Sequence, residues 1–259
     1  MYKIILFSPS IYSNYTLCVA EMLRQKDLEI AGIFAVKLFN RQRIKNEIRH
    51  NGTNLINKCF NKIIFRNQVK DYYCLASLKR DLHITSKHLK IYARQHQIPI
   101  WMVENLNTPF VANKLQEIQP DLAVFTGGGI IRESILTKCG HGVINCHEGI
   151  LPYYRGRSTI EWPILLNDFN NIGISTHLMT KNIDEGPILT TQRIPFIPNE
   201  KFSDYHHRLA PLMCEELVNS SVQLLNHKII PQFQAKQEGK LFFKMGRYAL
   251  ELAQEKMCC

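Results

Sequence analysis

The sequence of 259 residues lacks the features that mark membrane, secreted and metal-binding proteins. No apolar run reaches the roughly 18 to 20 uncharged residues that a bilayer span requires, and the first residues have neither the apolar stretch nor the cleavage site of a signal peptide. The eight cysteines include no C-x-x-C pair, which argues against a zinc site and against a secreted disulfide framework. We therefore expect a cytoplasmic protein with free thiols and no metal.

Nucleotide-binding signatures, internal repeats and low-complexity tracts are also missing. The glycine triplet Gly127-Gly128-Gly129 fits neither G-x-G-x-x-G nor a phosphate loop that ends in Lys-Ser/Thr. The remaining composition, with 45% hydrophobic and 21% charged residues, is that of an ordinary soluble globular protein. A chain of this length is expected to fold throughout, with one principal domain.

Acidic residues are scarce relative to basic ones, with 22 against 32 and a net charge of +10. The excess is concentrated in residues 37–66, where eight lysines and arginines accompany one acidic residue, Glu47. A positive field of this kind favours an anionic partner. Apolar residues in the same segment recur at helical spacing, so the charges can equally be the solvated faces of amphipathic helices. The two interpretations are compatible.

The periodicity of apolar residues predicts alternating strands and helices. The expected strands are 3–8, 28–34, 98–103, 122–125, 142–146, 172–178 and 188–195, and the expected helices are 12–25, 86–97, 108–119, 133–139, 203–225 and 247–257. Ser86 is a candidate N-cap of the helix at 86–97, and Pro120 ends the helix at 108–119. Such alternation specifies an α/β fold with a doubly wound, mostly parallel, Rossmann-like sheet and helices on both faces. Ligands of such sheets bind beyond the carboxyl ends of the strands.

The pattern divides the chain into a main domain, 1–225, and a short C-terminal appendage, 226–259. The main domain contains a basic helical insertion at about 40–80. In the appendage, the apolar run Leu241-Phe242-Phe243 suits either internal packing or a dimer contact. The terminal Cys258-Cys259 pair is a conceivable lipidation site, although a tail without a function is the simpler interpretation.

Polar side chains follow the apolar strand at 142–146. Asn145 and His147 are two residues apart, so they project to the same side of this strand. Acyl transfer to an amine needs a donor for the developing oxyanion, worth on the order of 100- to 1,000-fold in rate, and an acid or base, worth roughly 100- to 10,000-fold. An asparagine amide and a histidine have these abilities. Asp184, in a polar turn after strand 172–178, is the candidate carboxylate that orients the imidazole.

A histidine at a strand end is by itself more often structural, but here it lies within a longer pattern. Asn145-Cys146-His147-Glu148-Gly149-Ile150-Leu151-Pro152 is followed by Tyr154-Arg155-Gly156, Gly173-Ile174-Ser175-Thr176-His177 and Asp184-Glu185-Gly186-Pro187-Ile188. This pattern resembles that of the folate-dependent formyltransferases, which include glycinamide ribonucleotide transformylase, methionyl-tRNA formyltransferase and the sugar-nucleotide N-formyltransferases. The resemblance covers most of the chain and is specific mainly from 120 to 188. Gly149 replaces the serine that is usual in the family.

The resemblance implies that 1–225 is a formyltransferase catalytic domain, that Asn145, His147 and Asp184 are catalytic, and that N10-formyltetrahydrofolate is the co-substrate. Main-chain groups of two loops would hold the pterin ring; the implied binding residues are Gly127, Gly128, Gly129, Ile130 and Ile131 in the first loop and Met179, Asn182 and Ile183 in the second. Glycines suit this role because backbone without a Cβ can approach a flat ligand closely. Arg155 and Arg157 are candidates for binding a phosphate or the glutamate tail of the folate, and exposed loop charges are an equally good interpretation.

The acceptor of the formyl group stays open. An amino sugar on a nucleotide diphosphate is favoured by the resemblance and suits the basic segment. Methionyl-tRNA is less favoured because the enzymes that use it have a β-barrel C-terminal domain, where this sequence has only 226–259; the purine-pathway enzyme is typically shorter, without an insertion at 40–79. Hydrolysis of the formylfolate and a non-catalytic binding module are the remaining alternatives. We expect an anionic small-molecule partner rather than nucleic acid, and a homodimer is a candidate assembly.

Overall fold

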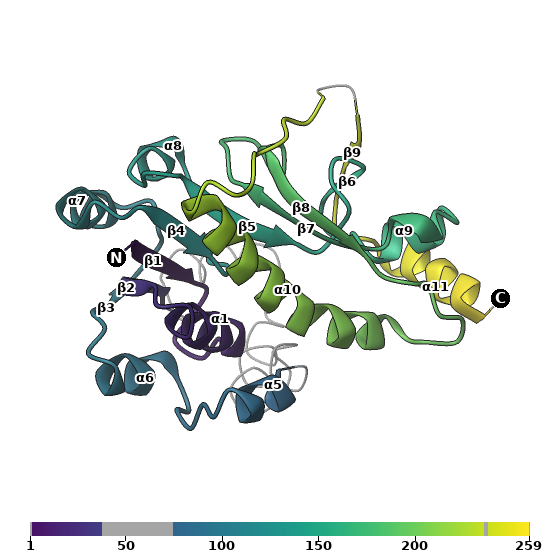
Figure 1. Ribbon diagram of the computed structural model, residues 1–259. Helices are drawn as coiled ribbons and strands as arrows, with labels where there is room; N and C mark the ends of the chain where they lie inside the picture. The colour runs from purple at the N-terminus through teal and green to yellow at the C-terminus, as the bar shows by residue number, and fades with distance from the viewer. Residues whose placement is uncertain (1, 38–74, 236–237, 259) are drawn as a thin grey trace, which may run out of the picture.

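The computed structural model describes residues 2–37, 75–235 and 238–258 (Figure 1). Its centre is a seven-stranded sheet in the order β3-β2-β1-β4-β5-β7-β8. The strands are β1 (Lys3–Ser8), β2 (Glu29–Val36), β3 (Ile100–Val103), β4 (Leu122–Phe125), β5 (Val143–His147), β7 (Gly173–Leu178) and β8 (Ile188–Arg193). Most of the predicted insertion at 40–80, and of the basic segment 37–66, lies outside the described residues.

The first five strands of this sheet are parallel, whereas β7 and β8 form an antiparallel hairpin at one side. The mostly parallel α/β class is therefore confirmed. The reversal at β7 has a local consequence, because antiparallel neighbours place their side chains directly opposite one another. Asn145 of β5 is opposite His177 of β7 in this register.

Helices cover both faces of the sheet. They are α1 (Asn14–Arg24), α5 (Ala76–Asp81), α6 (Leu89–Gln95), α7 (Pro109–Ile118), α8 (Glu133–Leu136), α9 (Glu161–Leu165), α10 (Phe202–Leu225) and α11 (Arg247–Glu255), with short 3-10 turns at Phe169–Asn171 and Lys256–Cys258. Figure 1 shows α1 and α10 across the front of the sheet and α7 and α8 to the left. Because strand side chains alternate, Ile4 and Leu6 of β1 join the core beneath α1 and α10, whereas Ile5 and Phe7 join the core beneath α7 and α8.

The capping rules can be compared with the structure at the starts of α7 and α6. Thr108 caps α7, and its hydroxyl accepts a hydrogen bond from Val111 N at 3.4 Å. The helix expected at 86–97 is α6, which begins at Leu89, after His88. The prediction that Ser86 is its N-cap is therefore wrong. The Ser86 hydroxyl instead donates to the side chain of Gln95, at the other end of that helix.

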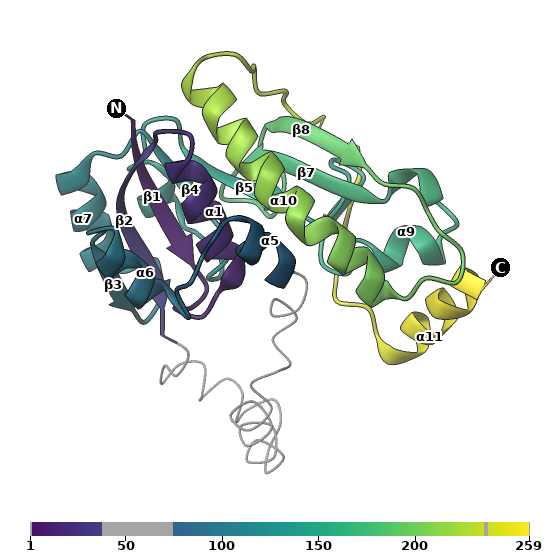
Figure 2. The ribbon, with the colours of Figure 1, turned by 60° about the horizontal axis from the view of Figure 1, so that its bottom comes forward.

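The C-terminal segment packs against the part of the chain that follows β5. Strand β9 (Lys240–Phe242) pairs in parallel with β6 (Tyr154–Gly156), and α11 lies beside α9 (Figure 2). Met245, Ala253 and Met257 are buried in this contact region. The division of the chain at 225/226 stays a prediction.

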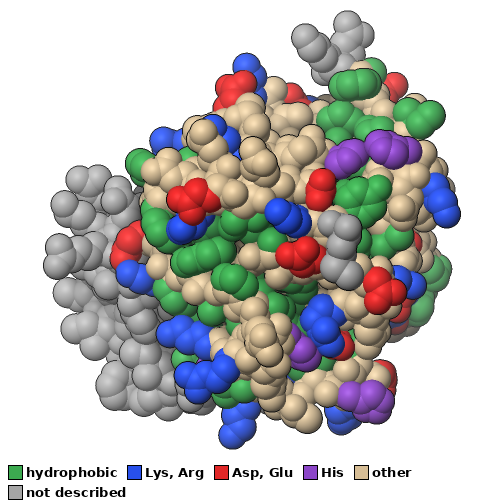
Figure 3. All heavy atoms as spheres, turned by 60° about the vertical axis from the view of Figure 1, so that its left-hand side comes forward, with side chains coloured by type: hydrophobic (Ala, Val, Ile, Leu, Met, Phe, Trp, Pro, Cys, Tyr) green, Lys and Arg blue, Asp and Glu red, His purple; other side chains and the backbone are tan. Residues whose placement is uncertain are grey.

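The surface charges, the cysteines and the lengths of the helices can be compared with the expectations from the sequence. On the side that carries α7 and α8, acidic and basic side chains are interspersed over the described residues, as Figure 3 shows. Cys18, Cys139, Cys146 and Cys214 are buried free thiols, as predicted. Among the helices of the described segments, none combines the length and apolar composition that crossing a membrane would need.

Candidate active site

Asn145 and His147 lie at the carboxyl end of β5, on the face of the sheet that α10 does not cover. Their neighbours Ile144 and Cys146 point the other way, into the core beneath α10. The same alternation on β7 places Ser175 and His177 on the side of Asn145 and His147. Polar side chains from two adjacent strands therefore share one surface at the end of the sheet.

His177 orients the amide of Asn145. His177 Nδ1 lies 3.1 Å from the carbonyl oxygen of Leu178, which can only accept, so this nitrogen carries the hydrogen. In the neutral ring Nε2 is then an acceptor, and it lies 3.2 Å from Asn145 Nδ2. Burial lowers the pKa of His177 to about 4, with Asp184 opposing this shift and His147 adding to it. The ring is therefore neutral near pH 7, and Asn145 keeps one N–H for another acceptor.

His147 is buried, and acceptor oxygens of the protein lie near both of its ring nitrogens. Nε2 lies 2.8 Å from the carbonyl oxygen of Tyr154, and Nδ1 lies 3.6 Å from Asp184 Oδ2. The first contact is a hydrogen bond, whereas the second has the length of an ion pair. Catalytic hydrogen bonds are often long in a free enzyme and shorten when the substrate binds.

Asp184 reaches both imidazole rings from the loop between β7 and β8. Its Oδ1 lies 3.6 Å from His177 Nε2, and its Oδ2 accepts a hydrogen bond of 2.9 Å from Gly156 N. The backbone of Asp184 has φ 53°, a left-handed conformation that costs a non-glycine residue about 1 kcal/mol or more. This loop conformation is thus held against a local preference.

The glycine loop that follows β4 is fixed at both ends. At its start, Thr126 Oγ1 lies 2.6 Å from Thr16 Oγ1 and donates to Phe7 O at 2.9 Å. At its end, Asn107 donates to Ile130 O and accepts from Arg132 N, each at 2.7 Å.

Within this loop, all three glycines have positive φ, from 104° to 126°, which side chains rarely adopt. A Cβ on Gly129 would meet no atom within 4 Å, so the loop backbone faces open space there. Ile130 is 66% exposed, whereas Ile131 is buried in the core and can offer a ligand only its main chain.

The second predicted loop and the arginines are arranged as follows. Ile183 is exposed, Met179 packs against the core beneath α7 and α8, and Asn182 donates to Glu185 Oε2 at 2.7 Å. The Arg155 side chain is 12% exposed; it pairs with Glu185 and donates to Gly239 O at 3.4 Å. Arg157 is exposed. An anion at Arg155 would therefore have to displace Glu185, whereas Arg157 is accessible.

Gly149, where the resemblance leads one to expect serine, is closely surrounded. A Cβ at this position would lie 2.7 Å from His147 Nε2 and 2.9 Å from Tyr154 O, the two atoms of the histidine's hydrogen bond. A side chain there would force at least one of them to move. The observed position of the His147 ring therefore depends on the absence of a side chain at position 149.

Two positions of the site carried no predicted role. His177 belongs to the segment Gly173–His177 of the family pattern, and the spacing of Gly173, Ser175 and His177 places all three on one face of a strand. Gln234, whose amide Nε2 donates to Asp184 O at 2.9 Å and to Gly186 O at 2.7 Å, had no sequence signal. Within the described ranges, no group of three histidine, cysteine or acidic side chains is arranged to hold a metal ion.

Relatives by sequence are methionyl-tRNA formyltransferases. The enzyme of Geobacter sulfurreducens is 33% identical over 147 residues, which are 56% of this chain and 46% of that protein; the Geobacter metallireducens enzyme is 35% identical over 130 residues, 50% of this chain and 42% of that protein. The chain spans about half the length of the curated relatives it matches.

Solved structures with a similar fold come from related enzymes. Glycinamide ribonucleotide transformylase 1 of Symbiobacterium toebii has a TM-score of 0.60 at 13% identity, over 90% of this chain and 93% of that one. An N-formyltransferase of Helicobacter canadensis also has a TM-score of 0.60, at 15% identity, over 100% of this chain and 81% of that one. These likenesses concern the fold.

The family model described as formyl transferase matches residues 42–220. This match covers more than half of the chain and includes the ends of β4 and β5 and the loop that carries Asp184. The chain therefore belongs to the formyl transferase family.

Proposed function

We propose that this protein transfers a formyl group from N10-formyltetrahydrofolate to a primary amine. The observation that carries the proposal is the convergence of Asn145, His147 and Asp184 at the carboxyl end of β5 in a member of the formyl transferase family. In a doubly wound sheet this edge is where ligands bind.

The loop after β4 has the properties that a pterin ring requires. Open backbone at Gly129 and the exposed apolar side chains of Ile130 and Ile183 offer main-chain hydrogen bonds and flat apolar contact. Gly127, Gly128, Met179 and Asn182 complete the proposed folate site. The folate would supply the formyl group, and the protein's own residues would bind it, orient it and handle the proton.

In this proposal Asn145 stabilises the oxygen that becomes negatively charged when the amine attacks the formyl carbon. One hydrogen of its amide is held by His177, so the other has a defined direction. A preorganised donor of this kind needs no reorientation during the reaction, and such donors are worth on the order of 100- to 1,000-fold in rate.

His147 is the proposed acid and base: because Nε2 donates its hydrogen to Tyr154 O, Nδ1 is the nitrogen that takes the proton from the attacking amine and supplies it to the departing folate nitrogen. Asp184 lies 3.6 Å from its Nδ1, where a carboxylate stabilises the charged ring. The Tyr154 carbonyl at Nε2 holds the ring plane.

The acceptor that we propose is an amino sugar linked to a nucleotide diphosphate. Support comes from the fold, which is shared with sugar N-formyltransferases such as the Helicobacter canadensis enzyme, whose structure was solved in complex with folinic acid and dTDP-3-aminofucose. A second enzyme of this kind, from Francisella tularensis, is a 4-N formyltransferase with a TM-score of 0.56. Arg157, which is exposed beside the site, is the accessible cation for a phosphate, with Arg155 next to it.

A second acceptor is favoured by a different observation. The 33% identity to methionyl-tRNA formyltransferase lies in the sequence itself, not only in the fold. Incubation with N10-formyltetrahydrofolate and, in turn, a nucleotide-linked 3-amino sugar, a 4-amino sugar and charged methionyl-tRNA separates the two. Mass spectrometry of each acceptor should detect formylation of an amino sugar but not of the tRNA.

The same assay without an acceptor tests the hydrolase alternative. Water can replace the amine in this chemistry, so the release of formate must be slow if the protein is a transferase. Rapid turnover that no acceptor accelerates would exclude the proposed transfer, and formylation of methionyl-tRNA alone would replace the proposed acceptor.

A further inference from the structure

We propose that Gln234, in the C-terminal segment, is a positioning residue for Asp184. The inference rests on the proposed function, because Asp184 is there the partner of the catalytic histidine. Gln234 is 50 residues away from Asp184 in the sequence, and its side chain amide contacts the main chain on both sides of Glu185.

The geometry of this contact fixes the orientation of the Gln234 amide. Its Nε2 donates one hydrogen to Asp184 O at 2.9 Å and the other to Gly186 O at 2.7 Å. The reverse orientation would place the amide oxygen against two carbonyl oxygens, which repel it. Both donors of Gln234 are therefore spent on the loop that carries the catalytic carboxylate.

The segment that bears Gln234 is itself anchored to the same loop. The backbone of Gln232 pairs with Ile188, the residue at which β8 begins, through two hydrogen bonds of 2.8 Å each. Gln234 follows two residues later and reaches back to Asp184 and Gly186. The chain after α10 is thus hydrogen-bonded to the loop between β7 and β8 at Asp184 and Gly186, and to the start of β8 at Ile188.

The loop has a reason to need this support. Asp184 is a non-glycine residue with φ 53°, so its conformation is not the one that an unsupported loop would choose. Among the described residues, its side chain accepts one hydrogen bond, from Gly156 N, and otherwise lies 3.6 Å from the nearest nitrogen of each of two imidazole rings. A small movement of the Asp184 main chain would therefore change the distance between the carboxylate and His147.

The experiment compares Gln234→Glu and Gln234→Ala with the wild-type protein. Glutamate keeps the shape but faces the two carbonyl oxygens with a carboxylate, and alanine removes the contact. Because misplacement of a catalytic group by about 1 Å can cost about 100-fold, we expect kcat for formyl transfer to fall about 10- to 100-fold in Gln234→Glu and about 10-fold in Gln234→Ala. KM for donor and acceptor should change less than about threefold, since Asp184 acts on the transition state rather than on binding.

Hydrogen exchange supplies a readout that does not depend on activity. Amides in peptides that cover residues 178–188 should exchange faster in both variants, because the loop opens locally, while the rest of the protein keeps its wild-type rates. Gln232→Ala is the matched control; within the described residues its exposed side chain donates to Ile230 O alone, and its backbone bridge to Ile188 is retained. It should keep wild-type kcat and exchange.

The outcomes distinguish the inference from the proposed function. If Gln234→Glu keeps kcat within twofold of the wild type, or if neither Gln234 variant changes exchange in 178–188, Gln234 does not position Asp184. If the wild-type protein formylates no acceptor, the proposed function fails, and the exchange measurement alone decides whether Gln234 holds the loop.

Discussion

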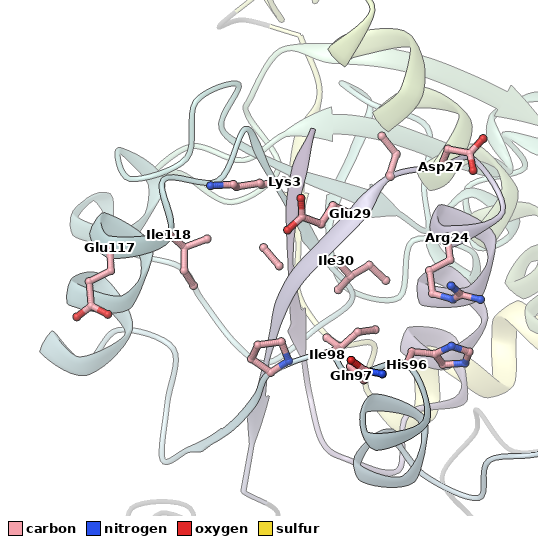
Figure 4. A pocket seen from close by; sticks show the side chains of 13 residues that line it. Lys3, Arg24, Asp27, Glu29, Ile30, His96, Gln97, Ile98, Glu117 and Ile118 are labelled. Atoms are coloured by element: carbon pink, nitrogen blue, oxygen red, sulfur yellow. The ribbon is translucent and has the colours of Figure 1, made fainter. Parts of the chain in front are cut away.

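The two ends of the sheet differ in how their polar side chains are arranged. At the amino ends of the strands there is an open hollow of about 560 Å³, lined by charged side chains of both signs from β1, β2, α7 and the turn after α1, among them Lys3, Asp27, Glu29 and Glu117 (Figure 4). At the carboxyl ends, polar side chains are buried and share their partners, as Asp184 does between two histidines.

This difference concerns how strongly the polar groups at each end interact. Charges that line an open hollow are solvated and interact weakly. At the opposite end, burial keeps His177 neutral and fixes the direction of the Asn145 amide, so each group has one defined task. Such mutual constraint is a criterion for a candidate functional site.

The largest expected effect comes from removing the polar side chains at the carboxyl end of β5. Asn145→Ala should lower kcat/KM for formyl transfer about 100- to 1,000-fold by removing the oxyanion donor, and His147→Ala about 100- to 10,000-fold by removing the proton carrier. Steady-state kinetics with the formylfolate and the best acceptor measures both.

A control for these variants comes from the other end of the sheet. Glu29→Gln changes an exposed side chain of the hollow and should leave kcat/KM within about twofold, as surface substitutions usually do. A loss at Glu29 comparable to that at His147 would mean that the hollow takes part in the reaction and would break the comparison.

A smaller effect is expected from restoring serine at position 149. Gly149→Ser places a Cβ against His147 Nε2 and Tyr154 O, so the ring must shift. We expect kcat to fall about 10-fold, with a loss of about 1–3 kcal/mol in the free energy of unfolding from overpacking.

Gly246→Ser is the matched substitution, because a Cβ at Gly246 meets no atom within 4 Å and serine is a favourable N-cap for α11. Activity assays and urea denaturation should find it close to wild type. Equal behaviour of the two variants would show that the space beside His147 is not restricted in solution.

The smallest effect concerns pH. The folded pKa of His177 is lowered to about 4 from the ordinary value of 6.5, so between these values the unfolded state binds more protons than the folded state. The contribution of His177 to stability is therefore present above about pH 6.5 and is lost as the pH falls toward 4. Between pH 7 and pH 5 the loss should be about 2 kcal/mol.

His177→Gln removes this titration. Urea denaturation at pH 7 and pH 5 should show a pH dependence that is weaker in the variant than in the wild type by about that amount. If both proteins lose the same free energy of unfolding on acidification, the buried neutral state of His177 is wrong.

Local rules explain what could be predicted before the structure. The apolar run 122–125 coincides with β4, and the helix expected at 108–119 matches α7, because strand and helix periods depend on neighbouring residues alone. The same alternation placed Asn145 and His147 on one side of β5. Ser86 failed as a cap because its hydroxyl has a side-chain partner nine residues away, which no local pattern contains.

The sequence by itself determined the alternation of strands and helices, the family pattern and the projection of Asn145 and His147 to one common side of β5, since all of these depend on residues close together in the chain. Only the tertiary structure decided that β7 runs antiparallel to β5, which brings His177 to Asn145 across 32 residues. It also decided that Gln234 reaches Asp184 across 50 residues. Such contacts form only when the sheet has assembled, and their geometry depends on the pairing of whole strands rather than on any local preference.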